Sequence, residues 1–166
     1  MSRESAEQDS QCPDESCSVE ATEAAAALCP ESRSAGSRVG LITVKALLTA
    51  GALRRLDGSA YRFCPDPGCD VVYFERATGS VFRKHDLRTR VGLKERDDPV
   101  PICYCFDVTE ADLRNEIATR GSTAVPAMIA AEVRAGHCAC EVRNPQGSCC
   151  LGNVSGAVAA LWSLDR

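Results

Sequence analysis

Eleven cysteines among 166 residues constrain this chain more than any other feature of its sequence. Six of them lie in two groups on either side of the segment 106–137. The first group is Cys103 and Cys105, and the second contains Cys138, Cys140 and the adjacent pair Cys149-Cys150. Four thiolates that converge from two loops are what an iron–sulfur cluster requires. A mononuclear zinc site is the competing use of the same ligands.

The composition favours metal sites over disulfides. Aromatic residues make up only 5% of the chain, so a large apolar core is not expected without the folding energy that a bound metal supplies. The N-terminus does not resemble an export signal, and no apolar run approaches the ~20 residues of a transmembrane helix. We therefore expect a cytoplasmic protein that is not membrane-embedded and whose thiols stay reduced.

The charge is unevenly distributed. Residues 1–37 carry eight acidic and two basic residues, whereas 38–166 carry fifteen acidic and seventeen basic ones. We interpret 1–28 as a disordered acidic tail, which contains Cys12 and Cys17. The nearly neutral remainder does not favour nucleic-acid binding. Residues 83–96 hold six basic and two acidic residues, which we interpret as a solvated face, with a docking patch for a partner as the alternative.

Residues 29–98 are predicted to form a small β domain. A strand is expected over 39–44, a helix over 45–56, a hairpin over 60–75 and a short strand at 81–82. The hairpin turn is Cys64-Pro-Asp-Pro-Gly-Cys69, and cysteines at the mouth of a tight turn are typical of zinc knuckles. Asp97-Asp98-Pro99-Val100-Pro101 is predicted to be the domain boundary.

Residues 99–166 are predicted to form a small helical domain, which makes the chain α+β. Thr109 and Asp112 resemble a capping box at the start of a first helix, which Gly121 ends. A second helix is expected from 122 or 123 to Gly136, with Pro126 in its first turn. A third is expected over 154–164, with its apolar side chains facing inward: Val154, Val158, Leu161 and Trp162.

The cysteine pattern of the helical part resembles the bacterioferritin-associated-ferredoxin type of [2Fe-2S] domain. A longer set of motifs resembles the N-terminal region of CopZ-type copper chaperones, which is known for one zinc and one [2Fe-2S] cluster. The motifs that carry this second resemblance are Tyr61–Cys64, Cys69–Phe74, Thr89–Glu95, Ile102–Cys105 and Asn144–Cys150.

The resemblance implies ligands for both metals. For the cluster they are Cys103, Cys105, Cys140 and Cys150. Cys138 is the main rival to Cys140, and Cys149 the rival to Cys150. The dipole of a helix that starts just after Cys105 would stabilise an anionic cluster.

For zinc, the resemblance implies Cys29, Cys64 and Cys69. This chain has Ser32 where the family has a fourth cysteine. The candidates to complete that site are Cys12, Cys17, Asp66, Asp70, His85 and water.

The resemblance implies an iron–sulfur and zinc binding metallochaperone, or a redox accessory protein, that handles copper and reduces Cu(II) to Cu(I). Cu(I) or another soft ion is a further candidate ligand. In chaperones of this type a Gly-x-x-Cys-x-x-Cys domain receives Cu(I), and the printed sequence contains no such motif. We therefore expect a separate metal-receiving protein or transporter. The alternative acceptors are the cysteines of the tail together with Cys138 and Cys149. A zinc-only interaction module and a ferredoxin-like electron carrier are the competing hypotheses. No catalytic triad or phosphate-binding glycine loop is visible, so turnover of an organic substrate is not expected.

Overall fold

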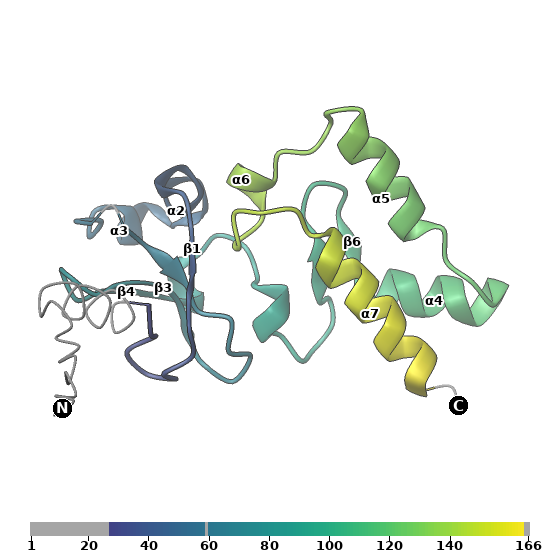
Figure 1. Cartoon of the computed structure of the whole chain (residues 1–166), viewed down its shortest axis with the longest axis horizontal. Helices are drawn as coiled ribbons and strands as arrows, with labels where there is room; N and C mark the ends of the chain where they lie inside the picture. Colours follow the sequence, from purple (N-terminus) through teal and green to yellow (C-terminus); the bar gives the residue numbers. More distant parts are fainter. Residues whose placement is uncertain (1–26, 59, 165–166) are drawn as a thin grey trace, which may run out of the picture.

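The computed structural model describes residues 27–58 and 60–164. The molecule is elongated, with a β part at one end and a helical part at the other (Figure 1). The α+β class expected from the sequence is confirmed. Among the described residues, no helix combines the length and apolar character needed to cross a membrane.

The β part is built on a four-stranded antiparallel sheet in the order β1-β2-β3-β4. Its strands are β1 (Ser37–Arg38), β2 (Arg62–Phe63), β3 (Val71–Glu75) and β4 (Ser80–Arg83). β2 and β3 form the predicted hairpin, with Phe63 paired to Tyr73. All five residues of β3 are buried, because aromatic and β-branched side chains fill both faces of a covered strand.

The predicted strand over 39–44 is wrong, and the helix over 45–56 is only partly right. The chain forms α2 (Leu41–Leu47) and then a separate short α3 (Ala50–Leu53). Val44, Leu47 and Leu48 recur at helical spacing and are buried in one core, so packing on one helical face outweighs the β-propensity of the segment. Thr49 begins α3, because its hydroxyl accepts a hydrogen bond from the Ala52 amide at 3.3 Å.

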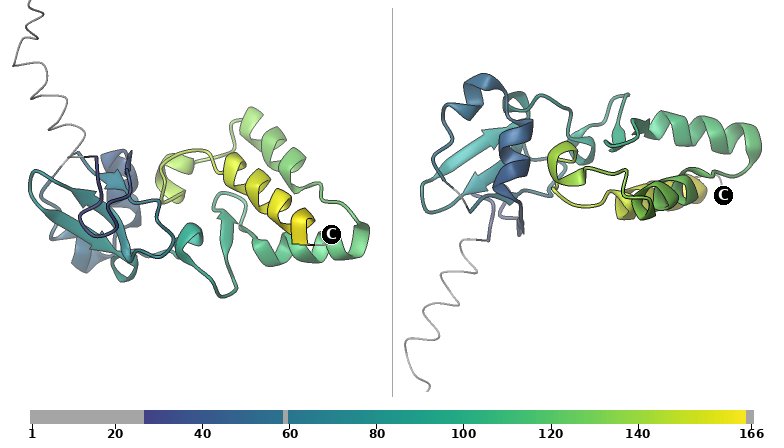
Figure 2. Two further views of the ribbon diagram at one scale, coloured as in Figure 1. Left: turned by 60° about the horizontal axis from the view of Figure 1, so that its bottom comes forward. Right: turned by 90° about the horizontal axis from the view of Figure 1, so that it is seen from above.

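The link between the two parts contains two short 3-10 helices, η1 (Lys84–Asp86) and η2 (Gly92–Lys94). A hairpin of β5 (Pro101–Cys103) and β6 (Val108–Thr109) follows. The helices come next: α4 (Glu110–Arg120), α5 (Val125–Arg134), α6 (Cys140–Arg143) and α7 (Leu151–Leu164). Figure 2 shows α4, α5 and α7 grouped at the end of the molecule away from the sheet.

The predicted helix signals of the helical part are confirmed in detail. Thr109 and Asp112 form a reciprocal capping box, and Gly121 ends α4 with φ 66°. Pro126 lies in the first turn of α5. α7 begins at Leu151, three residues before the predicted start. Trp162 is 40% exposed, so its predicted inward orientation is wrong.

The apolar core of the helical part includes two of the cysteines. Cys103 and Cys150 are fully buried with the side chains of β5, α4, α5 and α7. Val158 and Leu161 pack against this cluster as predicted, and Val154 belongs to it.

The β part and the helical part are in direct contact. α2 packs against α6, and the buried hydroxyl of Tyr73 donates a hydrogen bond to the carbonyl of Pro145 at 2.9 Å. Gly147 has φ 67°, and a Cβ there would lie 2.9 Å from the hydroxyl of Thr43, so glycine allows the loop to approach α2 closely. The loop that leads to Cys149 and Cys150 is therefore held against the β part.

Candidate metal centres

The three predicted zinc ligands converge in the β part. The sulfur atoms of Cys29, Cys64 and Cys69 all lie within 4.8 Å of one another, and those of Cys29 and Cys69 are 4.0 Å apart. Tetrahedral zinc with Zn–S bonds of about 2.3 Å places two sulfurs about 3.8 Å apart. The three thiols therefore fit three corners of a zinc site.

Local backbone hydrogen bonds present these thiols. Cys64 directly follows β2, and its amide donates to the carbonyl of Val72 at 2.9 Å. In the turn, the Asp66 carboxylate accepts from the Gly68 amide at 2.8 Å, and the Cys69 amide bonds to the Asp66 carbonyl at 3.3 Å. This is the side-chain turn that Asp favours between two strands. Sequence and structure agree on this hairpin.

Ser32 lies at the fourth corner. Its hydroxyl oxygen is 3.4 Å from the Cys64 sulfur, and it accepts a hydrogen bond from the Ser34 amide at 3.3 Å. Of the other candidates for this position, Cys12 and Cys17 lie outside the described residues.

The remaining candidates have other surroundings. Asp66 binds the turn, Asp70 lies 3.7 Å from Arg83, and His85 is 73% exposed beside Asp86. Within the described residues, no histidine or carboxylate joins the three thiols.

Sequence reasoning missed Lys94 as part of this site. Only 4% of Lys94 is exposed, although the segment 83–96 was expected to be solvated. Its ammonium group donates to the carbonyls of Asp66 at 2.6 Å and Cys69 at 3.1 Å. A buried charge is costly unless it is hydrogen-bonded, and here the turn that carries the cysteines supplies the acceptors. The other basic side chains of this segment include Arg83 and Arg90, which pair with Glu31 and Glu95.

The pKa values of the knuckle thiols depend on Ser32. Burial disfavours ionisation of Cys29, but hydrogen bonds with Ser32, with the Glu31 backbone and with Cys64 together outweigh burial and lower the pKa of Cys29. Burial raises the pKa of Cys64. The hydrogen bond with Ser32 and the charge of Lys94 lower this pKa, but by less than burial raises it.

A second set of cysteines converges between the β5–β6 hairpin and the α6 region. The sulfurs of Cys105 and Cys140 are 3.7 Å apart. Cys103 and Cys150 interact and are buried in the same apolar cluster. Cys140 and Cys150 are close enough for their charges to interact. The four predicted cluster ligands are thus brought together as two neighbouring pairs.

Peptide groups near this site come from two elements. After Cys105 the chain forms β6 and then α4, which begins at Glu110 as the capping box predicted. The amide that reaches a sulfur is that of Ala139, which donates to Cys105 at 3.3 Å. Ala139 directly precedes α6, so the second cysteine group supplies a donor to the first.

Crowding among the thiols opposes their ionisation. Burial, followed by the neighbouring Cys105, raises the pKa of Cys140 to about 12. Burial, followed by Cys103, raises the pKa of Cys150 well above its usual range. Metal binding at this site would therefore release protons, because thiolates rather than thiols are the ligands. Cys138 is half-buried and Cys149 is exposed.

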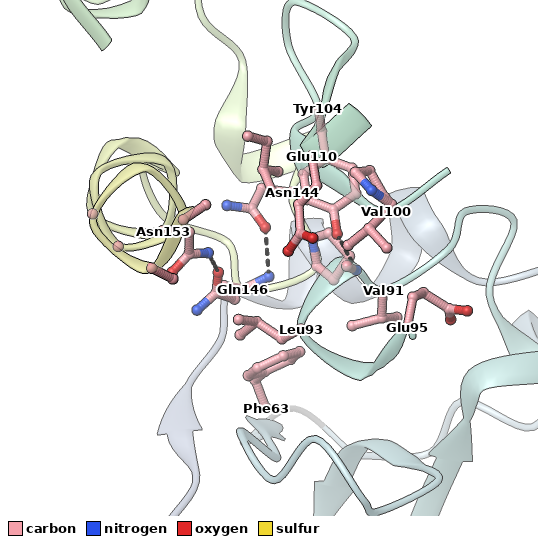
Figure 3. A pocket seen from close by; sticks show the side chains of 18 residues that line it. Phe63, Val91, Leu93, Glu95, Val100, Tyr104, Glu110, Asn144, Gln146 and Asn153 are labelled. Carbon is pink, nitrogen blue, oxygen red and sulfur yellow. Dashed lines mark hydrogen bonds between the residues drawn. The ribbon is translucent and has the colours of Figure 1, made fainter. Parts of the chain in front are cut away.

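A cavity of about 450 Å³ lies between the two parts (Figure 3). Gly92 and Tyr104 lie on one side, and the Gly92 amide donates to the Tyr104 hydroxyl at 2.8 Å. On another side, Asn153 donates to Gln146. None of the 18 described residues that line the cavity is a cysteine, so the cavity is separate from both thiol sites.

Comparison with known proteins identifies the family of the chain. A family model described as a zinc binding domain, of the CopZ type, matches residues 26–88. The X-ray structure of the Archaeoglobus fulgidus CopZ N-terminal domain is similar to this chain, with 37% sequence identity and a TM-score of 0.66. The matched region covers 78% of this chain and 95% of the chain in that structure. The chain belongs to the CopZ N-terminal domain family.

A full-length relative of this CopZ family chain is described as the copper chaperone CopZ of Archaeoglobus fulgidus. It is 41% identical over 138 residues, which is 83% of this chain. The chain spans 60% of the length of that relative. The expected resemblance to CopZ-type domains is confirmed, whereas the ferredoxin-like character of residues 99–166 stays a prediction.

Proposed function

We propose that this chain is an iron–sulfur and zinc binding metallochaperone for copper, which delivers one electron to Cu(II) and so produces Cu(I). The observation that carries the proposal is the convergence of four thiols, Cys103, Cys105, Cys140 and Cys150, from two loops in the helical part. Four thiols in this arrangement match the ligand set of a [2Fe-2S] cluster.

The donor set and its surroundings fit such a group. The two pairs, Cys105 with Cys140 and Cys103 with Cys150, match two irons that each take two thiolates. A [2Fe-2S] cluster held there would supply one electron at a time. Burial of Cys103 and Cys150 keeps water from one side of the site, and the Ala139 amide stabilises negative charge on Cys105.

The copper part of the proposal rests on family membership. The full-length relative is described as a copper chaperone, and thiolate sites select soft ions such as Cu(I). We propose that copper ions are the cargo and that a separate protein or transporter receives them. Metal and electron transfer, rather than turnover of an organic substrate, would then be the activity of this chain.

Metal analysis of protein purified without oxygen tests the cluster directly. We expect two irons per chain and the visible absorption of thiolate-bound iron. Zinc alone and a colourless protein, from cells competent in cluster assembly, would refute the redox function and favour a zinc-only module. Reversible one-electron reduction without any effect on copper would favour a ferredoxin-like carrier.

Paired variants test the ligand set. Cys103→Ser with Cys105→Ser should abolish the colour and the reduction of Cu(II), measured with a Cu(I)-specific chelator. Cys149→Ser is the matched control, because Cys149 is exposed and next to Cys150, and it should keep both. Loss of iron in Cys138→Ser but not in Cys140→Ser would contradict the assignment of Cys140.

A further inference from the structure

Among the residues that the structure describes, the Cys29–Cys64–Cys69 site has no fourth thiolate, imidazole or carboxylate that would close it around zinc. Structural zinc sites are four-coordinate, with thiolate or imidazole ligands. Here three thiols lie within 4.8 Å of one another, and the group beside them is the Ser32 hydroxyl. An aliphatic hydroxyl stays protonated near neutral pH and is a poor zinc ligand.

The hydrogen bonds of Ser32 indicate that it acts as a donor. Its oxygen already accepts from the Ser34 amide at 3.3 Å. Its proton is then available to the Cys64 sulfur, which is 3.4 Å away. A hydroxyl oriented in this way stabilises a thiolate instead of binding the metal, so the described part of the chain supplies three thiolate ligands to this site.

Access and charge suit an exchangeable ion. Cys29 and Cys64 are fully buried, whereas Ser32 is half-buried beside exposed Glu31. The open corner is therefore the one nearest to solvent, where an incoming ligand or ion can attach. Three thiolates with a monovalent cation carry two net negative charges, and the buried Lys94 ammonium, bonded to the Cys69 carbonyl, offsets part of them.

We propose that Cys29, Cys64 and Cys69 form a three-thiolate site in which Cu(I) replaces zinc, with Ser32 as a hydrogen-bond donor to Cys64. Three thiolates satisfy a soft monovalent ion, whereas zinc needs a fourth ligand. In the exchange, three metal–sulfur bonds pass from Zn²⁺ to Cu⁺, no thiolate is oxidised, and Zn²⁺ leaves as the free ion. The proposal rests on the copper-handling function and adds a binding site for the reduced ion.

Zinc release under buffered Cu(I) tests this site without interference from the other thiols. The full-length zinc-loaded protein is titrated with Cu(I) held by a chelator, without oxygen, and released zinc is measured with a zinc dye. We expect one zinc per chain to be released. In Ser32→Cys, which closes the zinc site, the copper-for-zinc exchange constant should fall at least about tenfold, or about 1.4 kcal/mol.

Two further variants and one spectrum make the result decisive. Ser32→Ala should keep three-sulfur copper coordination in X-ray absorption, because the hydroxyl is not a ligand, whereas Cys29→Ser should lose it. An exchange constant that is the same for wild type and Ser32→Cys would overturn the proposal. The visible colour of the cluster is recorded on the same samples. Normal colour with zinc retained during the Cu(I) titration refutes this inference alone. Absence of the colour refutes the proposed function.

Discussion

The Tyr73→Phe substitution should show how strongly the two parts of the chain hold each other. Tyr73 is fully buried in the core of the β part, and its hydroxyl donates to the carbonyl of Pro145, 72 positions along the chain. Burial raises the pKa of Tyr73 far above its usual range, so the phenol remains a donor at any physiological pH. Removal of the hydroxyl leaves a buried carbonyl without this donor.

The expected cost follows from the burial of both groups. A buried acceptor that loses its partner costs about 1–3 kcal/mol. For a chain of this length, each kcal/mol lowers Tm by about 2–4 °C. A central value of about 2 kcal/mol therefore predicts a Tm that is lower by about 4–8 °C.

Calorimetry on the metal-loaded protein measures this shift, and iron release measures its local effect. Pro145 lies between Cys140 and Cys150, so a loosened turn should also release iron faster. Tyr61→Phe is the matched control, because Tyr61 is equally buried but its hydroxyl bonds only within the β part, to Ser80 and Asp57. It should lower Tm without faster iron release. An unchanged Tm in Tyr73→Phe would refute the reasoning.

Three further changes have defined outcomes. Thr109→Ala removes the capping box of α4 and should lower the free energy of urea unfolding by about 1 kcal/mol. Gly92→Ala places a Cβ 1.8 Å from a backbone oxygen of β5, so this variant should unfold at a lower urea concentration. Gly156 lies inside α7 with open space around it, so Gly156→Ala should raise the free energy of unfolding by up to about 1 kcal/mol. Lys94→Met should speed zinc release to a chelator. Lys45→Met, at an exposed position of α2, is the control and should not.

Features set by a few neighbouring residues could be predicted from the sequence. The Cys64–Cys69 turn follows from the proline, glycine and Asp66 within it, and the start of α4 follows from Thr109 and Asp112. Such elements depend on hydrogen bonds between side chain and backbone over two or three residues. The spacing predicted only that the two cysteine groups meet if they share a metal, and the choice of Cys150 came from the resemblance to CopZ-type domains.

Features decided by distant contacts could not be predicted. The segment 39–44 contains strand-forming residues, yet α2 begins at Leu41, because Val44 packs with Leu47 and Leu48 in the core of the β part. Lys94 is typical of a solvated basic run, but the carbonyls that it meets belong to a turn about 25 positions earlier. Trp162 fits the periodicity of α7 and is nevertheless exposed near its end, where the cluster is already filled by Leu161 and Val158.

The short helix η2 connects the surroundings of the two thiol sites. At one end, the Gly92 amide donates to the hydroxyl of Tyr104, the residue between Cys103 and Cys105. At the other end, Lys94 donates to the carbonyls of Asp66 and Cys69 in the knuckle. Gly92 lies too close to β5 for a side chain, and the Lys94 ammonium is buried. Three consecutive residues therefore contact both the knuckle and the Cys103–Cys105 loop, so substitutions in η2 are expected to affect both thiol sites.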